Sequence, residues 1–235
     1  MGCESARSEP RLLSVASSVF AEPWPDLSAP RPIRFTYRPS VDEAPWLTDR
    51  WTARWSGSEP IAHELPRLFA DRWVRFHAPP GVKRYPQNDA ELDEVLFQHN
   101  AVVSDLITIG GPGSLAGRIV VVTCSWSGAE QPAPQHPDVA PRQPDASFWR
   151  SVRRGNPGFD SWTHLWASER QWETGCLDGL FALVATDRTH GVLVADEDFA
   201  WLYHPYGGGG GDVIAPSAES RDRIAEHRAS WLSHR

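Results

Sequence analysis

"RIVVVTCSW", residues 118–126, determines the fold class of this 235-residue chain. The residues from Ile119 to Val122 are all apolar and β-branched, without the polar alternation of a strand that has one face in water. This pattern is typical of a strand that is buried on both faces. We therefore predict that residues 118–126 form a central strand of a sheet, and we place the other elements around it.

A long amphipathic helix is predicted before this strand, over residues 88–107. Asn88 or Asp89 can cap it, and Glu91 follows Asn88 by three positions, as in a capping box. Apolar side chains recur at helical spacing and form one face: Leu92, Val95, Leu96, Val103 and Leu106. His99 lies on this face, so we expect it to hydrogen-bond within the core.

The chain directly after the central strand is rich in proline and tryptophan. Residues 128–142 predict a surface loop because proline and glutamine dominate the stretch. Trp162 and Trp166 are four positions apart, so a short helix could place both rings on one face.

The last third of the chain predicts two helices and a hairpin. Helical spacing of apolar residues indicates a helix over residues 177–187, and residues 190–206 predict two strands joined by an acidic turn. Residues 216–235 predict a terminal helix with Ser217 as its cap.

The N-terminal part differs in composition from the rest. Repeated prolines in residues 22–60 argue against long helices, while the aromatic residues there favour short strands. Residues 72–76, "RWVRF", predict a further short strand. We predict an N-terminal extension over residues 1–70 and a domain over residues 71–235. The domain is expected to be α+β, with a mainly antiparallel sheet and helices packed on it, preceded by the Pro/Trp-rich extension.

Charge and hydropathy restrict the partners. The net charge of -7 argues against broad binding to nucleic acid or to anionic lipid, because both need a basic face. No apolar run approaches the roughly 20 residues of a membrane span. Residues 12–21 are largely apolar, but three serines interrupt them, and Glu4 and Glu9 precede them where positive charge dominates in a signal peptide. We therefore expect a cytoplasmic protein without a membrane partner; its partner is unknown, and another protein is one candidate.

Two motifs resemble a bacterial family of unknown function. The first is "RFHAPPGVKRYP" over residues 75–86, and the second is "YHPYGGGGGD" over residues 203–212. They are similar to the domain of unknown function 3885, whose pattern contains R-F-H-x-x-P-x-x-K-R-Y-P and Y-H-P-Y-D-G-G-x-D. The resemblance covers residues 72–235 and implies no established activity. Gly207 departs from the pattern, which has aspartate at that position.

The first motif contains candidate residues for a site that binds an anionic group. Arg75, Lys83 and Arg84 could hold a phosphate or a carboxylate on a proline-stiffened loop. His77 could exchange a proton near neutral pH, and Tyr85 is a further candidate for ligand contact. The alternative interpretation is structural: the aromatic residues anchor the loop, and the cations pair with the acidic start of the following helix.

The second motif is open to the same two interpretations. The glycines of residues 207–211 could present backbone N–H groups to a ligand, with His204 and Tyr206 at the mouth and Asp212 as a hydrogen-bond acceptor or cation ligand. The run lacks the GK[ST] of a P-loop, and no helix follows it directly as in a dinucleotide fingerprint. We favour the alternative, in which the glycines only turn the chain.

No cofactor, metal or catalytic residue is predicted. His77, His99 and His204 could share a metal ion only if the fold brought them together, since their spacing matches no metal-binding motif. No serine lies in a G-x-S-x-G segment, and Cys124 has no evident activating base.

These observations are compatible with two functions. They do not decide whether the protein is an enzyme. The first hypothesis is a non-catalytic recognition or partner-binding module of a bacterial cell, such as an immunity protein. The alternative is a small-molecule enzyme or ligand sensor that binds an anionic group. Its site residues would be Arg75, Lys83 and Arg84 around the anion, with His77, His204 and Asp212 around the recognised atom. It requires the two motifs to meet in space.

Overall fold

The computed structural model describes residues 42–77, 85–109, 117–156, 159–207 and 209–232, and the side chains of residues 154–160 are outside this description. The fold is α+β, as predicted. Its helices are α1 (Pro45–Trp55), α2 (Leu65–Leu68), α3 (Asp89–Ile109), α4 (Asp178–Ala185) and α5 (Ala218–His227). Its strands are β1 (Trp73–Phe76), β2 (Arg118–Ser127), β3 (Ser147–Asn156), β4 (Phe159–Gln171), β5 (Leu193–Asp196), β6 (Leu202–Tyr206) and β7 (Gly210–Ile214).

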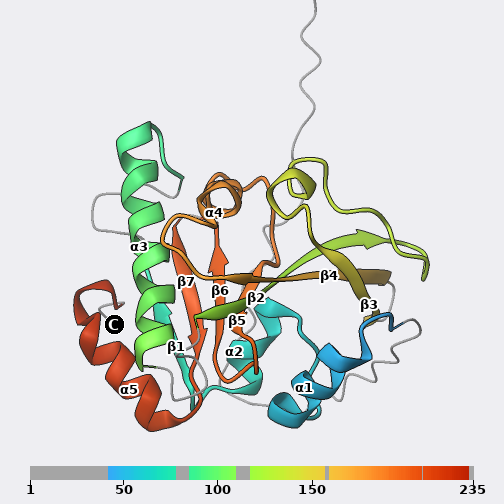
Figure 1. Ribbon diagram of the computed structural model, residues 1–235, viewed down its shortest axis with the longest axis horizontal. Helices are drawn as coiled ribbons and strands as arrows, with labels where there is room; N and C mark the ends of the chain where they lie inside the picture. Colours follow the sequence, from blue (N-terminus) through green and yellow to red (C-terminus); the bar gives the residue numbers. More distant parts are fainter. Residues whose placement is uncertain (1–41, 78–84, 110–116, 157–158, 208, 233–235) are drawn as a thin grey trace, which may run out of the picture. The chain divides into compact units, whose positions relative to one another are not determined.

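The strands form one antiparallel sheet in the order β1-β7-β6-β5-β2-β4-β3. Helices α3, α4 and α5 pack on the face that we call the front, and α1 and α2 pack on the back (Figure 1). Successive residues of a strand alternate between these faces. On β6, for example, Tyr203 belongs to the front core and Leu202 to the back core.

The expected elements around the central strand are confirmed. β2 is an interior strand with a buried run through its middle, and α3 covers the residues predicted as a long helix. The backbone N–H of Glu91 donates to Oδ1 of Asn88 at 2.9 Å, as a capping residue requires. Ser217 caps α5, because its Oγ accepts from the N–H of Ser220 at 3.1 Å.

Two element predictions are wrong. Residues 45–55 are helical rather than strand-forming, because Pro45 stands in the first turn, where proline is tolerated, and Trp51 and Trp55 bury their rings on the back core. Trp162 and Trp166 lie on strand β4, not on a short helix. A spacing of four places side chains on one face in both structures, so it did not discriminate between them. The division at residue 70 stays a prediction.

A loop replaces helices over part of the front face. Residues 128–146 lie against β2, β4 and β3 and contain only the short 3₁₀ helix η3 (Ala140–Arg142). Gln143 is buried, and its side-chain amide donates to the carbonyl of Val121 and to Oγ of Ser168. Polar side chains therefore hold this loop on the sheet. Among the described residues, no helix combines the length and the hydropathy that crossing a bilayer requires.

Candidate functional site

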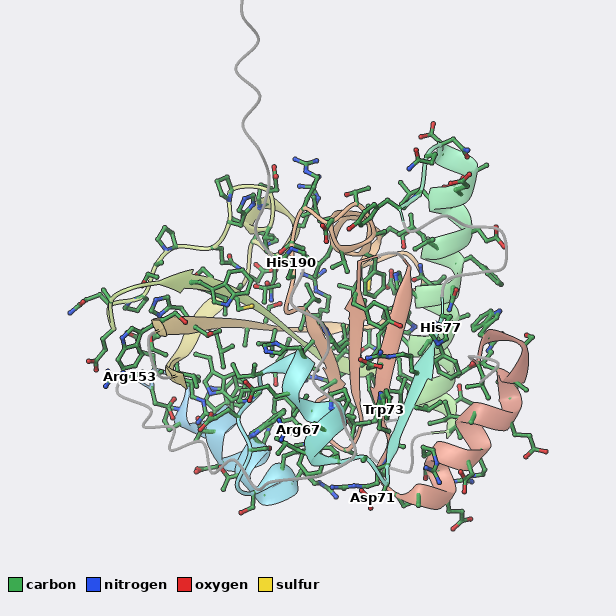
Figure 2. All side chains as sticks on the ribbon, turned by 180° about the vertical axis from the view of Figure 1, so that it is seen from behind. Arg67, Asp71, Trp73, His77, Arg153 and His190 are labelled. Carbon is green, nitrogen blue, oxygen red and sulfur yellow. The ribbon has the colours of Figure 1, made fainter. Side chains whose placement is uncertain are left out.

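The two motifs meet on the back face of the sheet. In the strand register Arg75 of β1 lies opposite Asp212 of β7, and Asp212 lies opposite His204 of β6. The alternation along each strand turns all three side chains to the back, where Figure 2 shows Trp73 on β1 from the side of α1 and α2. The meeting that the small-molecule hypothesis requires therefore occurs at this row.

Arg75 and Asp212 form a bidentate ion pair. The Nε–Oδ1 and Nη2–Oδ2 distances are 2.8 and 2.9 Å, and Nε1 of Trp73 donates to the same Oδ1 at 2.8 Å. The Asp212 side chain is only 4% exposed, and the hydrogen bond that Arg75 donates to its carboxylate raises the pKa of Arg75. The guanidinium lies over the rings of Trp73 and Tyr206, at 5.2 Å from each centroid. The guanidinium N–H groups of Arg75 that would bind a ligand anion are thus already bound to the carboxylate of Asp212.

His204 has a defined tautomer. Its Nδ1 lies 2.8 Å from the carbonyl oxygen of Val192, and a carbonyl can only accept, so Nδ1 carries the hydrogen. Burial lowers the pKa of His204, so the ring is neutral near pH 7. The lone pair of Nε2 is then the remaining acceptor of the ring.

His204 lines a cavity of about 280 Å³ between the back face and the segment before α2. The lining is mostly apolar, with aromatic rings at Trp126 and Tyr206 and three imidazoles at His63, His190 and His204. Glu64 contributes a carboxylate, 3.8 Å from Nε2 of His63. Concave apolar sites with a few convergent polar groups are typical of small-molecule binding.

Cys124 closes one side of this cavity with a protonated thiol. Its Sγ lies 3.6 Å from the carbonyl oxygens of His190 and Gly191, and burial raises its pKa to about 12. A Cβ on Gly191 would lie 2.4 Å from this sulfur, and the residue has a φ of +69°, so glycine is required there. The thiol packs against the backbone and is not a nucleophile near neutral pH.

The other candidates of the first motif lie elsewhere. His77 is exposed at the end of β1, where its backbone N–H donates to the carbonyl of Trp231 (Figure 2). Tyr85 donates from Oη to Oδ2 of Asp187 at 3.1 Å. Lys83 and Arg84 are outside the described residues.

The three histidines considered for a metal do not share a face. His99 is on the front, fully buried, with its Nδ1 2.5 Å from Oη of Tyr203, whereas His204 is on the back. The expected hydrogen bond of His99 within the core is confirmed. Over the part of the chain that the structure describes, no three His, Cys, Asp or Glu side chains are grouped to hold a metal ion.

The glycine run turns the chain and also makes room for two tyrosines. Tyr206 and Gly210 are register partners, and Gly209 has a φ of +82°, as in a short hairpin loop. A Cβ on Gly210 would lie 2.5 Å from Oη of Tyr206, and one on Gly211 would lie 2.5 Å from the ring of Tyr203. Gly210 and Gly211 belong to β7, a strand that the sequence analysis missed because glycine carries little strand propensity.

Gly207 lies beside a carboxylate from another element. A Cβ there would be 2.9 Å from Oδ1 of Asp187, which follows α4 and has a φ of +62°. The aspartate that the motif has at this position would therefore contact Asp187 directly. In this chain, the hydroxyl of Tyr85 finds its carboxylate on Asp187 instead.

Residues 61–235 match a family model described as domain of unknown function (DUF3885). The chain belongs to this family. No curated protein and no solved structure matches it.

The DUF3885 match begins at Ile61, which is itself a lining residue of the cavity. Sequence reasoning missed this side of the site, including His63, Glu64 and Trp126. These residues carry no motif. Trp126 lines the cavity from β2, whereas His63 and Glu64 approach His204 because the back face receives the segment before α2. The pairing of His204 with Asp212 could have been predicted from the sequence once a hairpin turn was placed in the glycine run. The two residues are equally distant from this turn, and residues at equal distances from a hairpin turn lie opposite each other.

Proposed function

We propose that this protein is a recognition module that binds a small molecule in the His204 cavity. The observation that supports this proposal is the neutral imidazole of His204 at a mostly apolar cavity. Its Nδ1 donates to the carbonyl of Val192, so its Nε2 remains as an acceptor. A ligand that donates an N–H or O–H to Nε2 fits this arrangement.

The charges around the cavity favour a neutral or cationic ligand over the anionic one expected from the first motif. The lining contains the carboxylate of Glu64 and no lysine or arginine. Arg75 adjoins the site, but its bidentate fork is held by Asp212. A ligand anion would have to compete with a carboxylate that is already buried and hydrogen-bonded.

Recognition of a protein partner has less support. The exposed large apolar side chains of the described region lie on four different elements: Trp46 on α1, Leu68 on α2, Phe97 on α3 and Trp126 on β2. A contiguous apolar patch would be the expected mark of a protein interface.

The test compares three ligands that share a benzene ring and differ in charge. Benzylamine, benzyl alcohol and benzoate are titrated by calorimetry or by NMR, and we expect the affinity to fall in that order. Benzoate binding best would contradict the charge argument, and absence of binding by all three would count against small-molecule recognition by aromatic donors.

A matched pair of variants tests the role of Nε2. His204→Asn retains an N–H near the position of Nδ1, able to donate to Val192, but has no atom at Nε2. We expect it to keep the unfolding midpoint within a few degrees and to lose at least tenfold in affinity, which is about 1.4 kcal/mol. His227→Asn is the control. It makes the same change in an exposed ring at the end of α5, and we expect it to bind the ligands like the wild type.

A further inference from the structure

A second polar constellation lies on the front face of the sheet, away from the cavity. Ser127 of β2, His164 of β4 and Ser151 of β3 form one chain of contacts. Oγ of Ser127 lies 2.8 Å from Nε2 of His164, and Nδ1 of His164 lies 2.7 Å from Oγ of Ser151. The strand register explains the contact, because Ser151 is directly opposite His164 and Ser127 is on a diagonal neighbour position.

The two hydroxyls also contact the loop that covers this face. Oγ of Ser127 lies 2.8 Å from the carbonyl oxygen of Ala129, and Oγ of Ser151 lies 3.1 Å from that of Glu130. His164 is fully buried, and burial lowers its pKa, so its ring is neutral near pH 7. A neutral ring supplies one hydrogen and each hydroxyl supplies one, so three hydrogens serve these four contacts.

Burial decides which contact lacks a hydrogen. Ala129 is exposed, so water can serve its carbonyl at little cost, whereas the bond from Ser151 to Glu130 is partly buried. The hydroxyl of Ser151 therefore donates to Glu130. The ring hydrogen is then on Nδ1 and donates to Ser151, and the hydroxyl of Ser127 donates to the lone pair of Nε2.

From this hydrogen assignment we infer that Ser127 is an activated nucleophile, with His164 as its general base and Ser151 as the residue that positions the base. A nucleophile within hydrogen-bond reach of a base, which is oriented by a third group, is the geometry of covalent catalysis by serine. Ser127 is only partly buried, and the neighbouring Gly128 has open space where a side chain would stand. An electrophile can approach from that side.

The reaction class is transfer from an activated acyl or phosphoryl donor. Oγ of Ser127 attacks the carbonyl carbon of an ester, and its proton moves to Nε2 of His164. The bond from that carbon to the leaving oxygen then breaks, and His164 returns the proton to this oxygen, which leaves as an alcohol. The product is an acyl ester of Ser127. This inference does not rest on the His204 cavity, which lies on the other face of β2.

The test uses diisopropyl fluorophosphate with the full chain. Oγ of Ser127 displaces fluoride from phosphorus, and its proton passes to His164. We expect intact mass spectrometry to show one added diisopropylphosphoryl group and peptide mapping to place it on Ser127. The rate should rise with pH and reach half its maximum below pH 6.5, because burial lowers the pKa of His164.

Three variants separate activation from folding. His164→Asn retains a donor toward Ser151 but removes Nε2, and we expect labelling to slow by a factor of about 10² to 10⁴ with the circular dichroism unchanged. Ser151→Ala should slow labelling less and alter its pH profile. Ser125→Ala is the control, because Ser125 holds the same loop through Ala133 and lies opposite His164 in the strand register but makes no hydrogen bond to its ring.

Three outcomes would overturn the inference. The first is a folded wild-type protein in which Ser127 reacts no faster than its other serines. The second is a label on Ser127 that forms equally fast in His164→Asn. The third is a labelling rate that Ser125→Ala lowers as much as His164→Asn does. If His164→Asn does not fold, the pH profile and the Ser151→Ala variant decide the question in the same way.

Discussion

The front face of the sheet is covered by two different means. Over β1, β7, β6 and β5 it carries α3, α4 and α5, packed through an apolar core that includes Phe181 and Leu106; we call this the helix half. Over β2, β4 and β3 it carries residues 128–146, held by polar side chains; we call this the loop half. Each half also buries one histidine: His99 in the helix half and His164 in the loop half.

The two coverings respond differently to damage. Apolar burial is strong and undirected, so the loss of core volume lowers the stability of the whole helix half. A satisfied polar network adds little net stability per bond but is costly when one partner is removed. We therefore expect damage in the loop half to open residues 128–146 locally, while damage in the helix half unfolds the protein.

The two halves also differ in their relation to the DUF3885 motifs. Residues 75–86 and 203–212 contribute β1, β6 and β7, which all belong to the helix half and to the His204 site behind it. The residues of the loop half lie between the two motifs in the chain. The Ser127 constellation is thus supported by geometry alone.

The largest expected effect is loss of a large side chain from the helix half. Phe181 is fully buried against the rings of His99 and Tyr203, with centroid distances of 5.0 and 6.4 Å. Phe181→Ala should lower the free energy of unfolding by about 3 to 5 kcal/mol, because it removes apolar contact and leaves a cavity. Urea unfolding measures this. A loss below about 1 kcal/mol would contradict the central place of this core.

The next effect is the response of the helix half to acid. Burial lowers the pKa of His99 to about 3, well below its value in the unfolded chain, so the folded state resists protonation. The contribution of His99 to the free energy of unfolding is fully present above pH 6.5 and is lost as the pH falls toward 3. At pH 4 the loss amounts to about 3 kcal/mol.

The measurement is the free energy of unfolding between pH 7 and pH 4 for the wild type and for His99→Leu. The variant starts lower, because Tyr203 loses its hydrogen-bond partner, but its free energy of unfolding should fall less steeply, because the contribution of His99 to the pH dependence is removed. Equal slopes for the two proteins would show that His99 does not resist protonation in the folded state.

A smaller effect is expected in the loop half. Gln143 accepts from Oγ1 of Thr123 at 2.7 Å and donates to the carbonyl of Val121 at 2.8 Å. Gln143→Leu removes the acceptor of the Thr123 hydroxyl hydrogen and a donor to the Val121 carbonyl, although Gln135 still donates to Oγ1 of Thr123 at 2.9 Å. The loss should cost about 2 kcal/mol. Hydrogen exchange should show residues 128–146 opening while α3 stays protected. Adding Thr123→Val should recover part of the loss, because it removes the hydroxyl hydrogen that lacks an acceptor in the single variant.

The same difference explains what could be predicted from the sequence. The helix half follows from periodicity, because Val95, Val103 and Leu106 repeat at helical spacing and are buried as expected. In the loop half, strand β2 follows from its β-branched run, but the loop over residues 128–146 gives no signal of how it packs. The buried position of Gln143 depends on strands β2 and β4 meeting beneath it. Arg75, Asp212 and His204 were all candidate residues in the sequence analysis. That all three lie side by side was not predicted, because this depends on strand β7, and the glycines of β7 give little strand signal.

The smallest expected effect concerns the motif departure at Gly207, at the edge of the helix half. Gly207→Asp brings a second carboxylate against Asp187, whose Oδ1 lies 2.9 Å from the position of the new Cβ. We expect a loss of about 1 kcal/mol, since both groups lie near the surface and salt screens their repulsion. Asp187→Gly in the same chain should recover this loss, because it removes the second charge and relieves the positive φ of Asp187.

The coupling between these two substitutions is the informative quantity. A double-mutant cycle from urea unfolding should give an interaction of about 1 kcal/mol, whereas independent positions would give about zero. A coupled pair would mean that the carboxylate that binds the hydroxyl of Tyr85 can come from the hairpin or from the end of α4, but not from both. The departure from the DUF3885 motif would then be a relocation of one charge within the helix half, because the space beside Gly207 accommodates a single carboxylate.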